Sequence, residues 1–169
     1  QCPGGALSLG LNPLFETLGD ARWPADMLLA TWVMAETGDV PVLEGRDEGG
    51  TLIGYAFRLS GQGFWDVIKG YVAVAPDLRT IIGISFFQQN ETPGLGAEIT
   101  KPPFRKQFEG KVIAAGQRPL SFKRPGAELG PSDVHAVTGA TQTSTRLEKI
   151  INGDLVEWRS RLSERSSRQ

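Results

Sequence analysis

Two residue types that build disulfides and metal sites are scarce in this chain. The 169 residues include one cysteine, Cys2, and one histidine, His135. A single cysteine cannot form an intramolecular disulfide, and one cysteine with one histidine does not make a metal cluster. The sequence therefore predicts neither an internal disulfide nor a metal site.

Charge of one sign and long apolar runs are missing as well. The formal net charge is -1, and Lys and Arg gather only in the C-terminal stretch RSRLSERSSR. We expect no nucleic-acid partner, because such proteins carry a strongly basic face. The most apolar run, Met27–Ala35, is far shorter than the roughly 20 residues of a membrane span. With 40% hydrophobic and 22% charged residues, the composition is that of a globular domain.

The middle of the chain has the pattern of consecutive β-hairpins. VPVLEGRDEGGTLIGYAFRLSG predicts two strands around the turn GRDEGG, and YVAVAPDLRTIIGISFF predicts two more around Pro76–Leu78. β-Branched and aromatic residues dominate these runs, as in strands. The sequence thus predicts an α+β fold with an antiparallel or mixed sheet, and KVIAA is expected to add another strand.

Helices are expected on both sides of these hairpins. Pro24 precedes ADMLLATWVMAETG, which predicts a helix, and PFRKQFEG predicts a short one. The C-terminal helix has an apolar stripe, with Gly153 expected to kink or divide it. The stripe consists of Leu147, Ile150, Ile151, Leu155, Trp158 and Leu162. We expect an arm and helix at 1–40 packed on a domain at 41–162, with a basic tail at 163–169.

The start of this last helix, VTGATQTSTR, is unusually rich in hydroxyl groups. They belong to Thr138, Thr141, Thr143, Ser144 and Thr145. One Ser or Thr is enough to cap a helix start. The free N–H groups and the positive dipole end of a helix start also suit a phosphate, and Gly139 and Ala140 leave room for a ligand. The stretch is either a helix cap with surplus hydroxyls or a phosphate site.

Two glycine-bearing loops are further candidates. NETPGLGAE follows a strand, and Gly94 and Gly96 with Pro93 shape its backbone around Glu91 and Thr92. It is either a tight loop or part of a ligand site, and the dinucleotide fingerprint is not met because no helix is expected after it. In SGQGFWDVIKG, Trp65 either packs in the core or stacks on a planar ligand.

These stretches together resemble the FMN-binding domain family. TGATQTS is similar to its flavin-attachment motif [S/T]-G-A-T-x-[T/S]. ETPGLGAE, and GQGFW followed by KGYVAVAPD, are similar to its loop and hairpin segments. The resemblance extends over about 41–158. It is nearest to the C subunit of the sodium-translocating NADH:quinone reductase and the G subunit of the Rnf complex.

The resemblance implies a specific cofactor chemistry. The fourth residue of the motif, here Thr141, carries FMN through a phosphoester bond that a flavin transferase forms from FAD. FMN then passes single electrons within a membrane redox complex whose other subunits are the partners. The resemblance places the domain on the outer face of the cytoplasmic membrane, with an anchor outside this chain.

The same resemblance suggests which residues surround the flavin. Thr138, Thr143 and Ser144 are expected to bind the phosphate or cap the helix. Glu91 and Thr92 are expected to make polar contacts with the isoalloxazine ring, and Leu95 an apolar one, in the loop shaped by Gly94. Trp65 is expected to contact or shield the ring.

One position departs from the family. The usual motif is D-x-x-[S/T]-G-A-T, and this chain has His135 in place of the Asp. The transferase is expected to need that carboxylate, which an imidazole does not replace. Asp133 lies two residues upstream, displaced by several ångströms along an extended chain.

Three hypotheses follow from these observations. The leading one is an FMN-carrying electron-transfer domain that turns over no substrate by itself. The alternative is a scaffold or binding domain that has kept the fold and lost its flavin, as His135 suggests. A flavin reductase with non-covalent FMN would need a nicotinamide site, for which the sequence shows no fingerprint.

Overall fold

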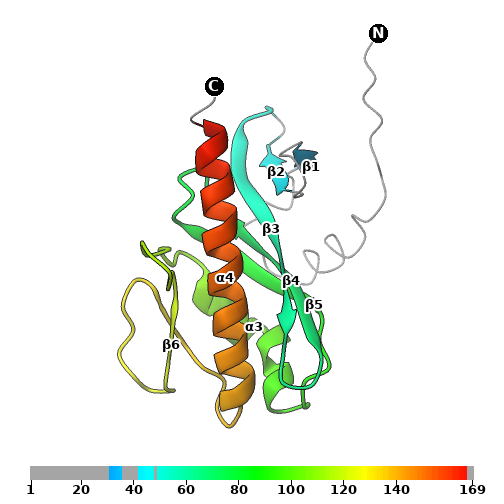
Figure 1. Ribbon diagram of the computed structural model, residues 1–169, viewed down its shortest axis with the longest axis vertical. Helices are drawn as coiled ribbons and strands as arrows, with labels where there is room; N and C mark the ends of the chain where they lie inside the picture. Colours follow the sequence, from blue (N-terminus) through cyan, green and yellow to red (C-terminus); the bar gives the residue numbers. More distant parts are fainter. Residues whose placement is uncertain (1–30, 36–41, 48, 167–169) are drawn as a thin grey trace.

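Five antiparallel strands form a meander in which the order in the sheet is the order in the sequence (Figure 1). They are β1 (Thr31–Ala35), β2 (Val42–Arg46), β3 (Leu52–Gln62), β4 (Val67–Val74) and β5 (Ile81–Gln88). This computed structural model describes residues 31–35, 42–47 and 49–166. The two predicted hairpins are confirmed as β2–β3 and β4–β5, and β3 also pairs with β4.

Short helices and a second, smaller sheet follow the meander. The 3₁₀ helix η1 (Gly96–Thr100), the α-helix α3 (Pro102–Arg105) and the 3₁₀ helix η2 (Lys106–Phe108) come first. Strands β6 (Ser121–Lys123) and β7 (Asp133–His135) then pair in parallel, and α4 (Thr141–Ser166) ends the described chain. The predicted α+β class and C-terminal helix are confirmed.

Three expectations about local structure are wrong. A helix was expected over 25–38, but Thr31–Ala35 form a strand that pairs with β2. The rest of that range lies outside the described residues. KVIAA forms only an isolated bridge between Val112 and Thr80. The helix α4 is not divided at Gly153, because it is one helix over Thr141–Ser166.

The core lies between one face of the sheet and α4. Four residues of the apolar stripe are buried, because Leu147 and Ile151 have no exposed surface and Leu155 and Trp158 have almost none. The Trp158 ring stacks on Phe57 of β3 with centroids 5.3 Å apart. Figure 1 shows α4 running along the sheet, with β6 on its other side. One end of the helix, with Thr141, is therefore fixed at one end of the sheet.

Polar side chains fasten both flanks of α4. On one flank, Asp154 Oδ2 accepts a hydrogen bond from Ser60 N at 3.0 Å, and Trp158 Nε1 donates to Arg58 O at 3.3 Å. On the other, Asn152 accepts from Leu120 N at 2.8 Å and donates to Leu120 O at 2.9 Å. These side chains satisfy backbone groups that have no strand partner there, as buried backbone requires.

The Asp154 contact predicts a pH-dependent stability difference. Burial, and then the nearby Glu157 carboxylate, raise the pKa of Asp154 above its ordinary value, against the opposing hydrogen bond from Ser60. The folded state thus favours the protonated form. The contribution of Asp154 to the free energy of unfolding is therefore fully present below its pKa in the unfolded chain, about 3.9. This contribution is lost as the pH rises through its higher pKa in the folded protein.

We therefore expect Asp154→Asn, which keeps an acceptor for Ser60 N without the charge, to gain stability over the wild type as pH rises. Urea unfolding of both proteins between acidic and neutral pH measures this difference. A difference that instead grows on acidification contradicts the prediction.

Candidate cofactor site at the start of the C-terminal helix

A tight turn at Val137–Ala140 leads into α4. Ala140 N donates to Val137 O at 3.2 Å, and Ser144 N donates to Ala140 O at 3.0 Å as the first helical bond. Gly139 has a φ of 75°, a conformation that L side chains rarely adopt. Thr141 is the first residue of the helix, and its side chain is exposed. Its hydroxyl therefore lies on the surface beside the N–H groups of a first turn, which have no partner within the helix.

The clustered hydroxyls have different environments. Ser144 Oγ is buried and accepts from Val137 N at 3.1 Å, so it caps the turn. Thr143 is also buried, and its hydroxyl donates to Glu91 Oε2. Thr138, Thr141 and Thr145 are exposed. Only these three hydroxyls are open to a ligand without disturbing a hydrogen bond of the fold.

A pocket of about 370 Å³ adjoins Thr141. Its lining combines hydroxyl, cationic and apolar groups from the β6 region and the start of α4. The lining residues are Phe122, Lys123, Arg124, Pro125, Ala136, Val137, Thr138, Gly139, Thr141, Ser144, Thr145 and Glu148. Lys123 lies 3.8 Å from Asp133, and Arg124 is exposed. The volume lies at the lower end of the range for small-molecule sites, roughly 300–1,000 Å³.

Glu91 lies on the other side of the first turn of α4 and is buried, with 4% of its surface exposed. Its Oε1 accepts from Phe64 N at 2.9 Å and from Trp65 N at 3.1 Å, while Oε2 accepts from Thr143. Glu91 therefore joins the β3–β4 turn to α4. Both carboxylate oxygens of Glu91 thus already accept hydrogen bonds from protein donors.

The loop after Glu91 is a turn that presents Leu95. Leu95 N donates to Thr92 O at 3.1 Å, with Pro93 and Gly94 at the central positions and a φ of 74° at Gly94. Pro followed by Gly in this geometry is the composition of a type II turn. The Leu95 side chain reaches 3.1 Å from where a Cβ on Gly139 would lie. The turn therefore brings Leu95 beside the attachment motif.

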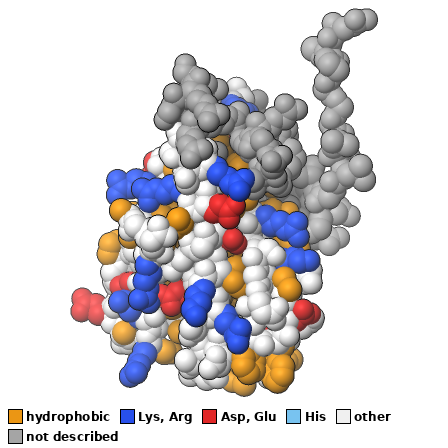
Figure 2. Space-filling view, viewed as in Figure 1, with side chains coloured by type: hydrophobic (Ala, Val, Ile, Leu, Met, Phe, Trp, Pro, Cys, Tyr) orange, Lys and Arg blue, Asp and Glu red, His pale blue; other side chains and the backbone are white. Residues whose placement is uncertain are grey.

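An apolar surface covers this end of the molecule. Among the described residues, the exposed large hydrophobic side chains are Phe64 (42%), Trp65 (64%) and Leu95 (43%). Figure 2 shows hydrophobic side chains gathered at the lower end, where α4 begins. Trp65 Nε1 donates to Thr92 Oγ1 at 3.1 Å, which orients the indole. Trp65 is thus exposed beside the site, and the alternative of core packing is wrong.

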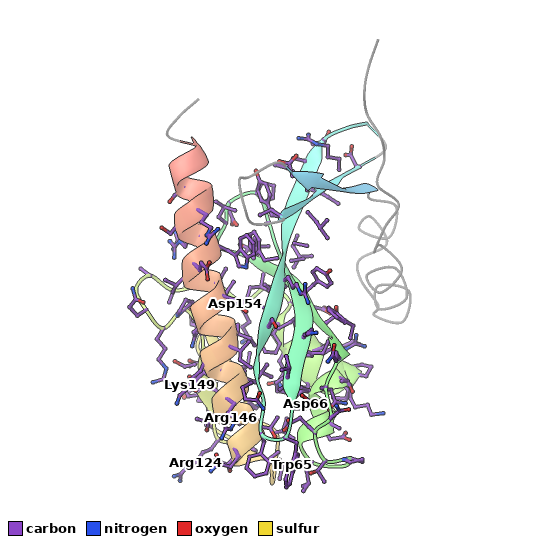
Figure 3. The ribbon with its side chains drawn as sticks, turned by 45° about the vertical axis from the view of Figure 1, so that its right-hand side comes forward. Trp65, Asp66, Arg124, Arg146, Lys149 and Asp154 are labelled. Atoms are coloured by element: carbon purple, nitrogen blue, oxygen red, sulfur yellow. The ribbon has the colours of Figure 1, made fainter. Side chains whose placement is uncertain are left out.

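Charged groups flank this apolar surface. The guanidinium of Arg146 lies 6.0 Å from the centroid of the Phe64 ring, within the range of a cation–π contact. Hydrogen bonds from Val67 N–H and then the Asn90 amide lower the pKa of Asp66, so its carboxylate is ionised at neutral pH. Trp65, Asp66, Arg124 and Arg146 lie at the same end of the molecule (Figure 3).

His135 has a structural partner. Its Nε2 lies 2.8 Å from Ala127 O, and because a carbonyl oxygen only accepts, Nε2 carries the proton. Gln107 holds its backbone by accepting from His135 N at 2.7 Å. An ionised Asp at this position has no proton to donate to Ala127. Asp133 accepts from Gly130 N at 2.9 Å and lies near Lys123, so its carboxylate is also engaged.

An exposed threonine at a helix start, beside a pocket of small-molecule size and an apolar surface, is the arrangement of a small α+β cofactor-binding domain. Residues 63–155 match the family model described as the FMN-binding domain. The chain belongs to this family, which confirms the resemblance.

Curated relatives support the same family membership. The chain is 35% identical over 138 residues to the C subunit of the Na(+)-translocating NADH-quinone reductase of Neisseria meningitidis serogroup A, covering 80% of this chain and 51% of that protein. It is also 35% identical over 121 residues to the corresponding protein of Vibrio anguillarum, covering 70% of this chain and 46% of that protein. The chain thus spans about half the length of these curated relatives.

The fold likewise matches crystal structures. The C subunit of the Na(+)-translocating NADH-quinone reductase from Parabacteroides distasonis superposes with a TM-score of 0.64 at 33% identity, covering 72% of this chain and 62% of that one. Shewanella oneidensis NqrC superposes with a TM-score of 0.62 at 25% identity, covering 79% and 67%.

The residues present fit FMN. The hydroxyls of Thr138 and Thr141, the cations Lys123 and Arg124, and the free N–H groups of the first turn are donors that suit a phosphate. Trp65 and Leu95 offer apolar surface to a flavin ring. Sequence reasoning missed Phe64, whose signal was its place beside Trp65 in GQGFW. It also missed Lys123 and Arg124, for which no local pattern exists.

Two features are absent from the described part of the chain. No group of three or more His, Cys, Asp or Glu side chains is placed to hold a metal ion. None of the helices there has both the length and the apolar character that crossing a bilayer requires.

Proposed function

We propose that this chain is an FMN-carrying electron-transfer domain with the flavin attached to Thr141 by a phosphoester. The observation that carries the proposal is the exposed Thr141 hydroxyl at the first residue of α4, beside a pocket with hydroxyl and cationic groups. The domain serves a membrane redox complex of the kind named for its relatives, with that complex's other subunits as partners. It works at the outer face of the cytoplasmic membrane.

The loading step is a group transfer from FAD by a flavin transferase. Thr141 Oγ1 forms a bond to the phosphorus of the FMN half, the pyrophosphate bond to the AMP half breaks, and AMP leaves. The hydroxyl proton passes to a base of the transferase or to solvent. Lys123, Arg124 and the first turn of α4 stabilise the negative charge that gathers on the phosphate.

Bound FMN supplies single-electron transfer, while the protein provides attachment, orientation and electrostatics. The Thr141 bond and the first-turn N–H groups fix the phosphate end. Trp65 and Leu95 provide apolar surface that keeps water from part of the ring. Neither contact needs a rearrangement of the fold, since both side chains are already exposed there.

Co-expression with a flavin transferase tests the proposal. We expect the denatured protein band to fluoresce under ultraviolet light and the intact mass to rise by one FMN less one water. A colourless protein of unchanged mass, beside a related chain that loads in the same cells, excludes covalent attachment. Oxidation of NADH by the isolated domain would instead indicate a flavin reductase.

His135 supports a second candidate, a scaffold domain that has lost its flavin. Where the family's motif has an Asp carboxylate, this chain has an imidazole whose hydrogen bond to Ala127 O is a contact within the fold. In this candidate the wild type stays colourless under conditions that load a chain with the usual Asp.

We predict that the wild type loads and that His135→Asp loads faster, on the order of tenfold, because the carboxylate assists the transfer. His135→Asn is the matched control, since it has the size of Asp without the charge. Initial rates of flavin incorporation measure the effect. A wild type that never loads while His135→Asp does supports the scaffold candidate, and equal rates in all three proteins remove any role for this position.

A further inference from the structure

Glu91 is a buried carboxyl group without a cationic partner among the described residues. None of the salt bridges in that part of the chain includes it. Its three donors are neutral: the N–H groups of Phe64 and Trp65 and the hydroxyl of Thr143. A buried carboxylate is stable only when its oxygens are hydrogen-bonded, so these contacts must be kept.

The three donors come from segments far apart in the sequence. Phe64 is separated from Glu91 by 27 positions and Thr143 by 52. The β3–β4 turn and the first turn of α4 therefore meet at one carboxylate. A backbone N–H donates along a fixed direction, so these bonds define the orientation of the turn that bears Trp65.

Two glycines let the segments approach this closely. A Cβ on Gly63 would lie 2.6 Å from Glu91 Oε1, and one on Gly96 would lie 2.5 Å from Thr143 Oγ1. Both distances are far below van der Waals contact. The backbone at Gly63 and Gly96 is therefore packed closely against Glu91 and Thr143, and neither position has room for a side chain.

We propose that Glu91 is a positioning residue for flavin loading and does not itself contact the flavin. Through Thr143 it fixes the first turn of α4, which begins with Thr141. Through the N–H groups of Phe64 and Trp65 it fixes the apolar surface opposite. This inference rests on the proposed function, since it concerns the residue that holds the attachment site in place.

The first experiment measures the transferase reaction with this chain as acceptor. Glu91→Ala removes all three contacts, and we expect kcat to fall about ten- to a hundredfold, as for a displaced reacting group, with KM little changed. Glu91→Gln should load nearly as the wild type, because its carbonyl accepts from the two N–H groups and its amide donates to Thr143 Oγ1. Thr143→Val should lower kcat, and Thr143→Ser should not.

Asn152→Ala is the matched control for general destabilisation. It removes the buried pair of hydrogen bonds to Leu120 farther along α4 and leaves the first turn intact. It should unfold more easily and still load at the wild-type rate in native buffer. Wild-type loading by Glu91→Ala, or an equal loss in Asn152→Ala, overturns the proposal. An equal loss in Glu91→Gln also overturns it, because the charge would then matter rather than the contacts.

The second experiment needs no flavin. Hydrogen exchange of the Phe64 and Trp65 amides, followed by NMR in the unloaded protein, should be at least about tenfold faster in Glu91→Ala. It should be unchanged in Glu91→Gln and little changed in Thr143→Val, which retains the Oε1 contacts. Unchanged exchange in Glu91→Ala overturns the positioning role. A chain that never loads but shows the expected exchange refutes the proposed function and not the Glu91 contacts.

Discussion

Thr141→Ala is expected to abolish covalent flavin completely. The phosphoester needs a hydroxyl oxygen, and in this variant the first residue of α4 has none. The other exposed hydroxyls, Thr138 and Thr145, differ from Thr141 in their place relative to the first turn. Because transfer requires the attacking oxygen to lie in line with the phosphorus, we expect neither to replace it. The intact mass should match the unmodified chain.

Two further variants and one stability measurement make this test specific. Thr145→Ala removes another exposed pocket hydroxyl from the same helix and should load normally. Thr141→Ser retains the nucleophile with more rotational freedom, so it should load more slowly. Thr141→Ala should unfold at nearly the wild-type denaturant concentration, because an exposed side chain contributes little stability. Flavin still attached in Thr141→Ala would place the anchor elsewhere.

Phe108→Ala is expected to have the largest effect on stability. Phe108 has no exposed surface, and its ring lies 5.4 Å from that of Phe104 and 6.1 Å from that of Phe122. It thereby joins η2 to β6, under the segment that carries Lys123 and Arg124. Deleting a buried Phe ring costs about 3–5 kcal/mol, a large part of the roughly 5–15 kcal/mol that stabilises a domain.

Phe64→Ala is the matched control for that prediction. The same atoms are removed from a ring that is 42% exposed and whose contacts are Trp65 and Arg146. We expect a loss of about 1 kcal/mol or less. Urea unfolding followed by circular dichroism compares the two, and similar losses would contradict the assigned burial of Phe108.

Sequence patterns predicted those parts of the fold that depend on neighbouring residues. The hairpins β2–β3 and β4–β5 have turns and alternation within single stretches, and the stripe of α4 repeats along one helix. Strand β1 was predicted as a helix because its apolar run is compatible with either structure, and pairing with β2 decides between them. Strands β6 and β7 are three residues each, too short for a period to be detected.

In the candidate site, too, features within one stretch of sequence were predictable and contacts between distant residues were not. Thr141 and its motif are contiguous in the sequence, and the predicted helix does begin there, with Thr141 exposed. The contacts of Glu91 were not predictable, because its donors lie 27 and 52 positions away. Likewise, His135 was noticed as a departure from a pattern, but its bond to Ala127 depends on how the β6–β7 connection folds.

The side chains that fasten α4 to β3 also cover part of an open strand edge. Beyond Phe57, β3 has no strand partner on the β2 side within the described residues, and an unpaired edge is a template for another chain. Asp154 and Trp158 already occupy the Ser60 N–H and the Arg58 carbonyl there. The helix thus covers part of this edge, and we expect that loosening its second half would expose a template for edge-to-edge pairing.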